Sequence, residues 1–157
     1  MRGEKLLSSK EINGFNLFMG KAKCGTCHFM PLFSGAKPPR FYFIESEVIG
    51  VPATKNKRQP KLDSDSGRFL ITRQPLHLFS FKTPTLRNIA LTAPYMHNGV
   101  FSSLEEVVEF YTDGGGKGLH IAPTNQSLPF ERLGLTKDER ANIVAFMKTL
   151  TDTSASH

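Results

Sequence analysis

The feature that most constrains this chain is the motif CGTCH, residues 24–28. Cys24 and Cys27 stand about one helical turn apart, so both thiols can add to the vinyl groups of one haem, while His28 reaches the iron from the same side. We therefore expect a single covalent haem c and a fold that wraps this large, rigid cofactor. Half of a zinc site and a dithiol redox motif are weaker interpretations, because the remaining histidines show no paired spacing and the chain shows no βαβ pattern.

The composition is that of one soluble globular domain, with 157 residues of which 39% are apolar and 22% charged. Both cysteines lie within the motif, so no disulfide framework supports the fold. No stretch approaches the roughly 18–20 consecutive apolar residues that cross a bilayer, and the first residues show no secretory signal. Because haem c is normally attached outside the cytoplasm, we expect a periplasmic or otherwise extracytoplasmic location, with a signal upstream of Met1.

The formal charge of +6 comes from Lys and Arg residues that are scattered along the chain. Their densest cluster is KNKR, residues 55–58, and no recognised nucleic-acid motif accompanies it. A solvated loop is the better interpretation of this cluster. We expect neither a nucleic-acid partner nor a membrane span.

Local signals predict a mainly α fold, a cytochrome c-like haem domain with about four helices and long loops that wrap the cofactor. Three capping boxes mark helix starts: Ser8 with Glu11, Ser103 with Glu106, and Thr136 with Glu139. We expect the first helix to run to the threshold of Cys24 and a shorter helix over residues 83–91. Prolines interrupt residues 29–80, although FYFIESEVIGV, residues 41–51, could hold a short strand.

His28 would occupy the fifth position of the haem iron, so the residue at the sixth position separates an electron carrier from a catalyst. Thioether, imidazole and phenolate groups all bind haem iron. Met19 and Met147 fall on helical faces, where methionine usually fills a core, and Met30 lies too close to His28 to reach the opposite face. Spacing leaves three candidates open: Met96, His97 and Tyr111.

The segment FKTPTLRNIALTAPYMHNGVFSSLEEVVEFYTDGG, residues 81–115, resembles the C-terminal haem domain of bacterial di-haem cytochrome c peroxidases and their MauG-like relatives. With CGTCH before it and LTKDERANIVAFMKTL after it, the resemblance covers most of the chain and is weak only over residues 36–62. It implies that residues 1–157 form a single c-type cytochrome domain, a C-terminal fragment of a larger oxidoreductase. This domain would relay electrons to a peroxide-reacting haem in an N-terminal domain.

The same resemblance implies a ligand pair. His28 would be the proximal ligand, and the family's sixth-ligand position falls on Tyr111, where peroxidases carry methionine and MauG-like members carry tyrosine. The helical pattern by itself favours a core aromatic with a hydrogen-bonded hydroxyl at Tyr111, and the resemblance reverses that preference. A phenolate is a hard anionic donor that favours ferric iron, so Tyr111 would give a haem of low potential.

Further residues are implied more loosely. Met96 would lie near the haem edge, and the backbone oxygens of Thr92 and Pro94 would help to hold a calcium ion between two domains. Arg87, and with less support Arg68, could pair with haem propionates or lie on the surface. A redox donor protein would be a partner. The competing hypothesis is a self-standing mono-haem electron-transfer cytochrome.

Overall fold

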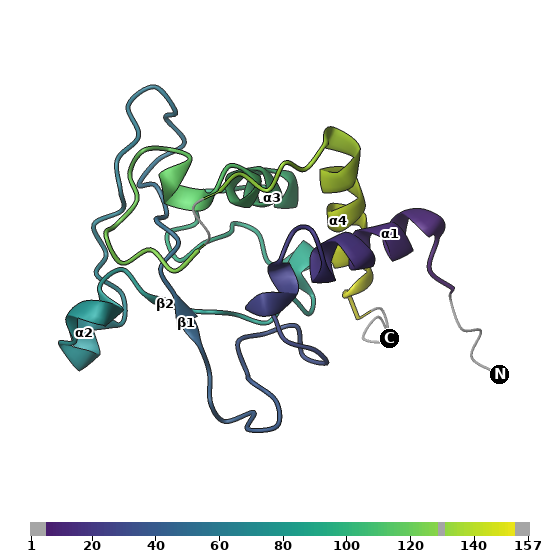
Figure 1. Ribbon diagram of the computed structural model, residues 1–157, viewed down its shortest axis with the longest axis horizontal. Coiled ribbons are helices and arrows are strands. Elements are labelled where there is room, and N and C mark those ends of the chain that lie inside the picture. The colour runs from purple at the N-terminus through teal and green to yellow at the C-terminus, as the bar shows by residue number, and fades with distance from the viewer. Residues whose placement is uncertain (1–5, 129–130, 153–157) are drawn as a thin grey trace.

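The computed structural model describes residues 6–128 and 131–152, and within these ranges helices and loops dominate (Figure 1). This confirms the predicted mainly α class. The α-helices are α1 (Ser9–Met19), α2 (Phe69–Thr72), α3 (Leu104–Thr112) and α4 (Lys137–Thr149). Single 3₁₀ turns cover Cys24–Thr26, Pro75–His77, Ile89–Leu91 and Gly115–Lys117, and the strands are β1 (Ser46–Glu47) and β2 (Phe81–Lys82).

All three predicted capping boxes are present and begin α1, α3 and α4. At α3, for example, the Glu106 amide donates to Ser103 Oγ at 3.2 Å, and the Ser103 amide donates to Glu106 Oε2 at 3.3 Å. Each box satisfies backbone donors that a helix start leaves without partners. Local chemistry therefore sets where the three main helices begin.

The main core lies where α1 crosses α4 (Figure 1). The crossing is close because Gly14 faces α4, where a Cβ atom would lie 2.0 Å from the Asn142 carbonyl oxygen. Around it, the ring of Phe146 packs edge-on against those of Phe15 and Phe18, both at 5.3 Å between ring centroids. Phe18 is fully buried, so the end of α1 is held firmly beside the haem motif.

Two expectations about helices are wrong. Residues 83–91 do not form a helix, because Thr83 pairs with Glu45 as extended chain and Asn88 takes a left-handed conformation, so only Ile89–Leu91 make a turn. Helix α1 also stops at Met19 rather than at the threshold of Cys24, since Gly20 caps it and Lys23 turns left-handed. The single turn of α2, which no capping signal marks, was not predicted.

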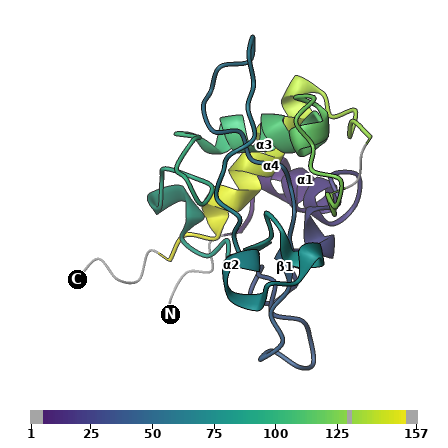
Figure 2. The same cartoon turned by 90° about the vertical axis from the view of Figure 1, so that its left-hand side faces the viewer.

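Long loops form the other half of the molecule, as the prolines predicted. The expected strand is reduced to β1, which pairs antiparallel with β2, with Ser46 opposite Lys82 and Glu47 opposite Phe81. In Figure 2 this pair and α2 lie on the side that faces the viewer, with α1 and α4 behind them. None of the helices in the described ranges is long and apolar enough to span a membrane.

Candidate haem site

The CGTCH motif folds as one tight turn directly after α1. The amides of Cys27 and His28 both donate to the Cys24 carbonyl oxygen, at 3.2 and 3.0 Å. Both thiols are free and partly exposed, so the turn presents them without a disulfide. Met19 lies against Gly25 in this turn but is 37% exposed, so the core-filling role expected for it is wrong.

The imidazole of His28 is oriented by two backbone carbonyl groups. Its Nδ1 lies 3.3 Å from the Phe33 oxygen and 3.2 Å from the Pro84 oxygen, so Nδ1 carries the proton and donates it. Nε2 then bears the lone pair, and no residue in the described ranges forms a hydrogen bond to it. Burial lowers the pKa of His28, which keeps the ring neutral. A neutral, oriented imidazole is suited to bind a metal ion.

The surroundings of both thiols keep them protonated. Burial raises the pKa of Cys24 to about 12. The pKa of Cys27 is raised by burial and, to a smaller extent, by the negative charge of Glu47. These are therefore not the reactive thiolates of a dithiol redox site, whose pKa values are lowered by their surroundings.

Tyr111 lies near the CGTCH turn, although α3 carries it from a distant part of the sequence. Burial raises the pKa of its phenol most, and the pKa is raised further because a phenolate would be repelled by ionised thiolates of Cys24 and Cys27 and by the carboxylate of Glu47. Its half-buried ring packs against the core, but no residue in the described ranges accepts a hydrogen bond from its hydroxyl. By contrast, the hydroxyl of Tyr95 donates to the Ile89 carbonyl oxygen at 3.0 Å. A buried phenol normally finds such a partner.

Together these groups form a donor set that fits a covalent haem. Two neutral thiols stand on one turn, and an imidazole nitrogen beside them is available. A phenol that has no hydrogen-bond partner within residues 6–128 and 131–152 lies close to both thiols. This set matches the attachment and axial groups of a c-type haem.

The other two candidates for the sixth position are placed differently. Met96 is half-buried, packs against the hydrophobic core and has a positive φ of 71°. His97 is engaged elsewhere, because its Nε2 lies 3.2 Å from Asp63 Oδ1 and its ring stacks on that of Phe81 at 3.7 Å. His97 therefore already has a polar partner, unlike Tyr111.

The remaining predicted site residues lie on the surface. Arg87 is exposed and donates from Nη2 to the Pro31 carbonyl oxygen at 3.0 Å. Arg68 donates to Ser46 Oγ at 2.9 Å. Thr92 and Pro94 are exposed in one loop, where the Thr92 hydroxyl donates to the Ile89 carbonyl oxygen.

Sequence reasoning missed three groups close to this site. The carbonyl oxygens of Phe33 and Pro84 orient His28, and no side-chain signal could mark them, because any residue supplies a carbonyl oxygen. The third is Glu47 on β1, whose carboxylate accepts a short hydrogen bond from the Ser127 hydroxyl. Glu47 follows Glu45 in a segment without a recognised motif, so the sequence carries no signal of such a contact.

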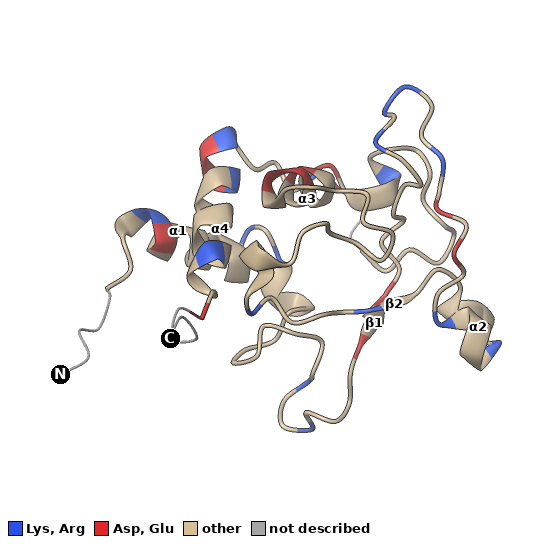
Figure 3. Cartoon of the chain, turned by 180° about the vertical axis from the view of Figure 1, so that it is seen from behind, with Lys and Arg blue, Asp and Glu red and all other residues tan. Residues whose placement is uncertain are grey.

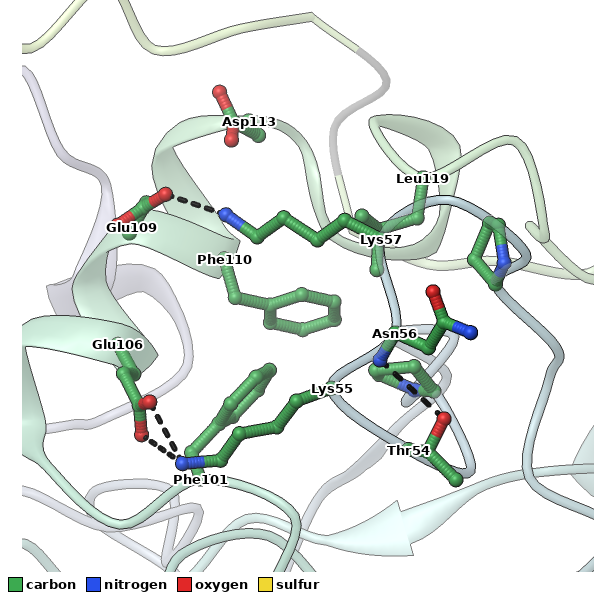
Figure 4. A pocket seen from close by; sticks show the side chains of 12 residues that line it. Thr54, Lys55, Asn56, Lys57, Phe101, Glu106, Glu109, Phe110, Asp113 and Leu119 are labelled. Atoms are coloured by element: carbon green, nitrogen blue, oxygen red, sulfur yellow. Dashed lines mark hydrogen bonds and ion pairs between the residues drawn. The ribbon is translucent and has the colours of Figure 1, made fainter.

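Two cavities lie outside this donor set. One of about 220 Å³ lies between the loop of residues 53–61 and α3, where Lys55 and Lys57 pair with Glu106 and Glu109 at 2.7 and 2.6 Å (Figure 4). The basic cluster predicted to be a solvated loop is thus partly paired with α3. The other, of about 630 Å³, opens beside β1 and is lined by Glu47 and Arg68.

Comparison with known proteins places these observations in a family. The Cytochrome c family model matches residues 12–151. Cytochrome-c peroxidase IdrP1 of Pseudomonas sp. (strain SCT) is 35% identical over 92% of this chain and 40% of its own length. The methylamine utilization protein MauG of Methylorubrum extorquens is 33% identical over 94% of this chain and 36% of its own length.

Solved structures agree with these matches. A MauG-like protein associated with microbial copper homeostasis has a TM-score of 0.78 and 33% identity over 97% of this chain and 50% of its own. The diheme peroxidase BthA from Burkholderia thailandensis E264 has a TM-score of 0.64 and 27% identity, over 94% and 44%. The chain spans about two fifths of the length of the curated relatives cited above. It is a cytochrome c domain and belongs to the family of di-haem cytochrome c peroxidases and MauG-like proteins.

Proposed function

We propose that this chain is the electron-relaying haem domain of a cytochrome c peroxidase-like or MauG-like oxidoreductase. Its partner is an N-terminal domain of the same protein, whose haem reacts with peroxide, and a redox donor protein supplies electrons from outside. The parent protein is extracytoplasmic. The length of the relatives supports this proposal, since this domain covers half or less of each protein cited.

The observation that carries the proposal is the phenol of Tyr111, which lies close to the CGTCH turn and forms no hydrogen bond with any residue in the described ranges. Cys24 and Cys27 hold a single haem c through thioether bonds, and His28 binds from the side of that turn through Nε2. Tyr111 would hold the iron as a phenolate, and the positive charge of a ferric iron would offset the raised pKa of the free phenol. When bound, the haem supplies one-electron exchange.

If His28 and Tyr111 both hold the iron, no iron position would remain for peroxide in this domain. Its residues therefore favour electron transfer over peroxide chemistry, which we assign to the partner haem. A thioether at the sixth position would stabilise ferrous iron, whereas the phenolate stabilises ferric iron and makes the domain a low-potential donor.

We also propose roles for four surrounding residues. Arg87 pairs with a haem propionate through guanidinium donors other than the one that bonds Pro31. Met96 packs at the haem edge without binding iron. The backbone oxygens of Thr92 and Pro94 contribute to a calcium site that the N-terminal domain completes, because a carbonyl oxygen is a ligand that calcium prefers.

The test uses the whole gene product with its haem attached. Proteolytic haem peptides are counted by mass spectrometry, and hydrogen peroxide consumption is measured with a reduced donor. We expect two haem peptides and catalytic peroxide consumption. One haem peptide together with no peroxide consumption would instead identify a self-standing mono-haem carrier and contradict the proposal.

A further inference from the structure

Glu47, on β1, is a half-buried acidic residue to which the proposed function gives no role. It lines the cavity of about 630 Å³ beside β1. Glu45, two residues earlier, pairs with Lys37 at 3.2 Å, and this pairing offsets its charge. By contrast, no cationic side chain in the described ranges forms an ion pair with Glu47, whose carboxylate is held by a hydroxyl group. The negative charge of Glu47 is therefore not compensated by a neighbouring cation.

The chain just before Glu47 is fixed beside His28. The Thr83 amide donates to the Glu45 carbonyl oxygen at 3.1 Å. The residue after Thr83 is Pro84, which supplies one of the two carbonyl oxygens that orient His28. Because extended chain advances about 3.3 Å per residue, Glu47 lies roughly 7 Å along the chain from this contact.

The chain just after Glu47 is fixed beside the end of α3, which carries Tyr111. The Gly116 amide, five residues after Tyr111, donates to the Ile49 carbonyl oxygen at 2.9 Å. The side chains of Ile49 and Tyr111 both pack against the main core. Glu47 therefore lies between a contact beside His28 and a contact beside Tyr111. In Figure 3 the red acidic positions at β1 lie between α1 and α4 on one side and α2 on the other.

A hydrogen-bonded contact with Ser127 fixes the side chain of Glu47. The Ser127 hydroxyl donates to Glu47 Oε2, and the Val48 amide donates to Ser127 Oγ at 2.9 Å. The Ser127 amide donates in turn to the Val48 carbonyl oxygen at 2.9 Å. The carboxylate is thus held in place. Beyond the effect of burial, its negative charge raises the pKa values of the Cys27 thiol and the Tyr111 phenol, so it acts on both sides of the donor set.

We propose that Glu47 lowers the reduction potential of this domain, as a fixed negative charge close to the haem donor set. The inference rests on the haem ligands of the proposed function. Reduction of ferric iron by a donor protein adds one electron, and a carboxylate without a cationic partner disfavours the added negative charge. Glu47 does not bind the iron. It favours the ferric state through its charge, in the same direction as a phenolate ligand.

A redox titration of the whole haem-loaded gene product tests the proposal. The haem of this domain is the one whose low-spin signal Tyr111→Phe removes. Glu47→Gln removes the charge and keeps an acceptor for the Ser127 hydroxyl. We expect this variant to shift the equilibrium at least tenfold toward ferrous iron, which is a rise of about 59 mV in the potential of a one-electron couple. Its low-spin signal should stay unchanged, because Glu47 is not a ligand.

Three further variants separate the charge of Glu47 from its contacts. Ser127→Ala removes the hydroxyl and keeps the Glu47 charge. Glu105→Gln removes a carboxylate from α3 whose side chain is 62% exposed. We expect each of these two changes to shift the equilibrium less than threefold. Glu47→Asp, which keeps the charge, should lie closer to the unchanged protein than to Glu47→Gln.

Four results would overturn this role of Glu47 and leave the proposed function intact. The first is an unchanged potential in Glu47→Gln. Equal shifts in Glu47→Gln and Ser127→Ala would assign a structural contact, and equal shifts in Glu47→Gln and Glu105→Gln would assign the overall charge of the domain. Loss of the low-spin signal in Glu47→Gln would assign a role in ligand positioning.

Failure of the proposed function is recognised separately. A low-spin signal that survives Tyr111→Phe rejects the ligand pair of the proposed function and this inference with it. A single haem peptide in the same sample rejects the proposed function alone, because the titration of that one haem still tests Glu47.

Discussion

The carbonyl oxygens of Phe33 and Pro84 decide which nitrogen of His28 is available to a metal ion. Both lie within hydrogen-bonding distance of Nδ1, so the proton stays there and Nε2 is left to bind iron. Such outer contacts fix the orientation of a ligand as firmly as its own backbone position does. Tyr111 differs from His28, because no residue in the described ranges accepts a hydrogen bond from its hydroxyl.

Removal of the two thiols tests covalent attachment at the same scale. In a Cys24→Ser and Cys27→Ser double variant, we expect the haem to be extracted completely into acidified acetone, because no thioether bond remains. Thr26→Ser on the same turn should keep its haem in the protein fraction. Haem retained by the double variant in the Soret absorbance of that fraction would contradict attachment at CGTCH.

At the residue scale, the part of the candidate site that the sequence predicts most directly is the haem-attachment motif. CGTCH predicts haem directly, whereas the prediction that Tyr111 binds the iron rests on family resemblance, because helical spacing alone favours a core aromatic there. What makes Tyr111 unusual is that no residue in the part of the chain that the structure describes accepts a hydrogen bond from its hydroxyl, which depends on how α3 packs beside the CGTCH turn. No local sequence pattern records a tertiary contact of that kind.

At the scale of elements, the crossing of α1 and α4 depends on Gly14. A Cβ atom there would lie 2.0 Å from the Asn142 carbonyl oxygen and 2.9 Å from Phe146 Cβ, and neither atom can move without its helix. We expect Gly14→Ala to lower the free energy of unfolding by about 2–3 kcal/mol, despite the better helix propensity of alanine. Asn13→Ala, an exposed neighbour on α1, is the control, and denaturant unfolding measures both. Equal stability of the two variants would contradict this crossing.

The loop of residues 53–61 is tied to α3 by an ion pair with a predictable pH dependence. Lys55 and the Ser102 amide lower the pKa of Glu106 from 4.5 to about 2. Because the folded state lowers the pKa of Glu106, the ionised carboxylate stabilises the fold above about pH 4.5. This contribution to the free energy of unfolding is lost as the pH falls toward about 2.

We therefore expect Lys55→Met to destabilise the domain at neutral pH by at most about 1 kcal/mol, because the pair is exposed. The difference from the unchanged protein should shrink as the pH falls from 4.5 toward 2. Lys61→Met in the same loop should change stability little at either pH. A destabilisation by Lys55→Met that stays constant over this range in denaturant titrations would contradict the ion pair.

Elements with a complete local signal were predictable, and elements made by tertiary contacts were not. The capping boxes of α1, α3 and α4 lie within four residues each, so the sequence reports them directly. Residues 83–91 look helical by composition, yet Thr83 pairs with Glu45 across the loop half of the molecule, and that pairing prevents a helix. A long-range contact of the same kind pairs β1 with β2.

At the scale of the whole molecule, the helical half and the loop half contribute different groups to the candidate haem site. The helical half holds the CGTCH turn and carries Tyr111, while the loop half supplies Pro84 and Glu47 (Figures 1 and 2). The candidate haem site is therefore assembled from both halves of the chain.

The most direct measurement of the central claim is the spin state of the ferric haem in Tyr111→Phe, recorded by electron paramagnetic resonance and optical spectra. We predict that this variant becomes high-spin and five-coordinate, because phenylalanine offers no donor atom, whereas Met96→Leu stays low-spin like the unchanged protein. A Tyr111→Phe haem that remains low-spin, together with a Met96→Leu haem that becomes high-spin, would contradict it.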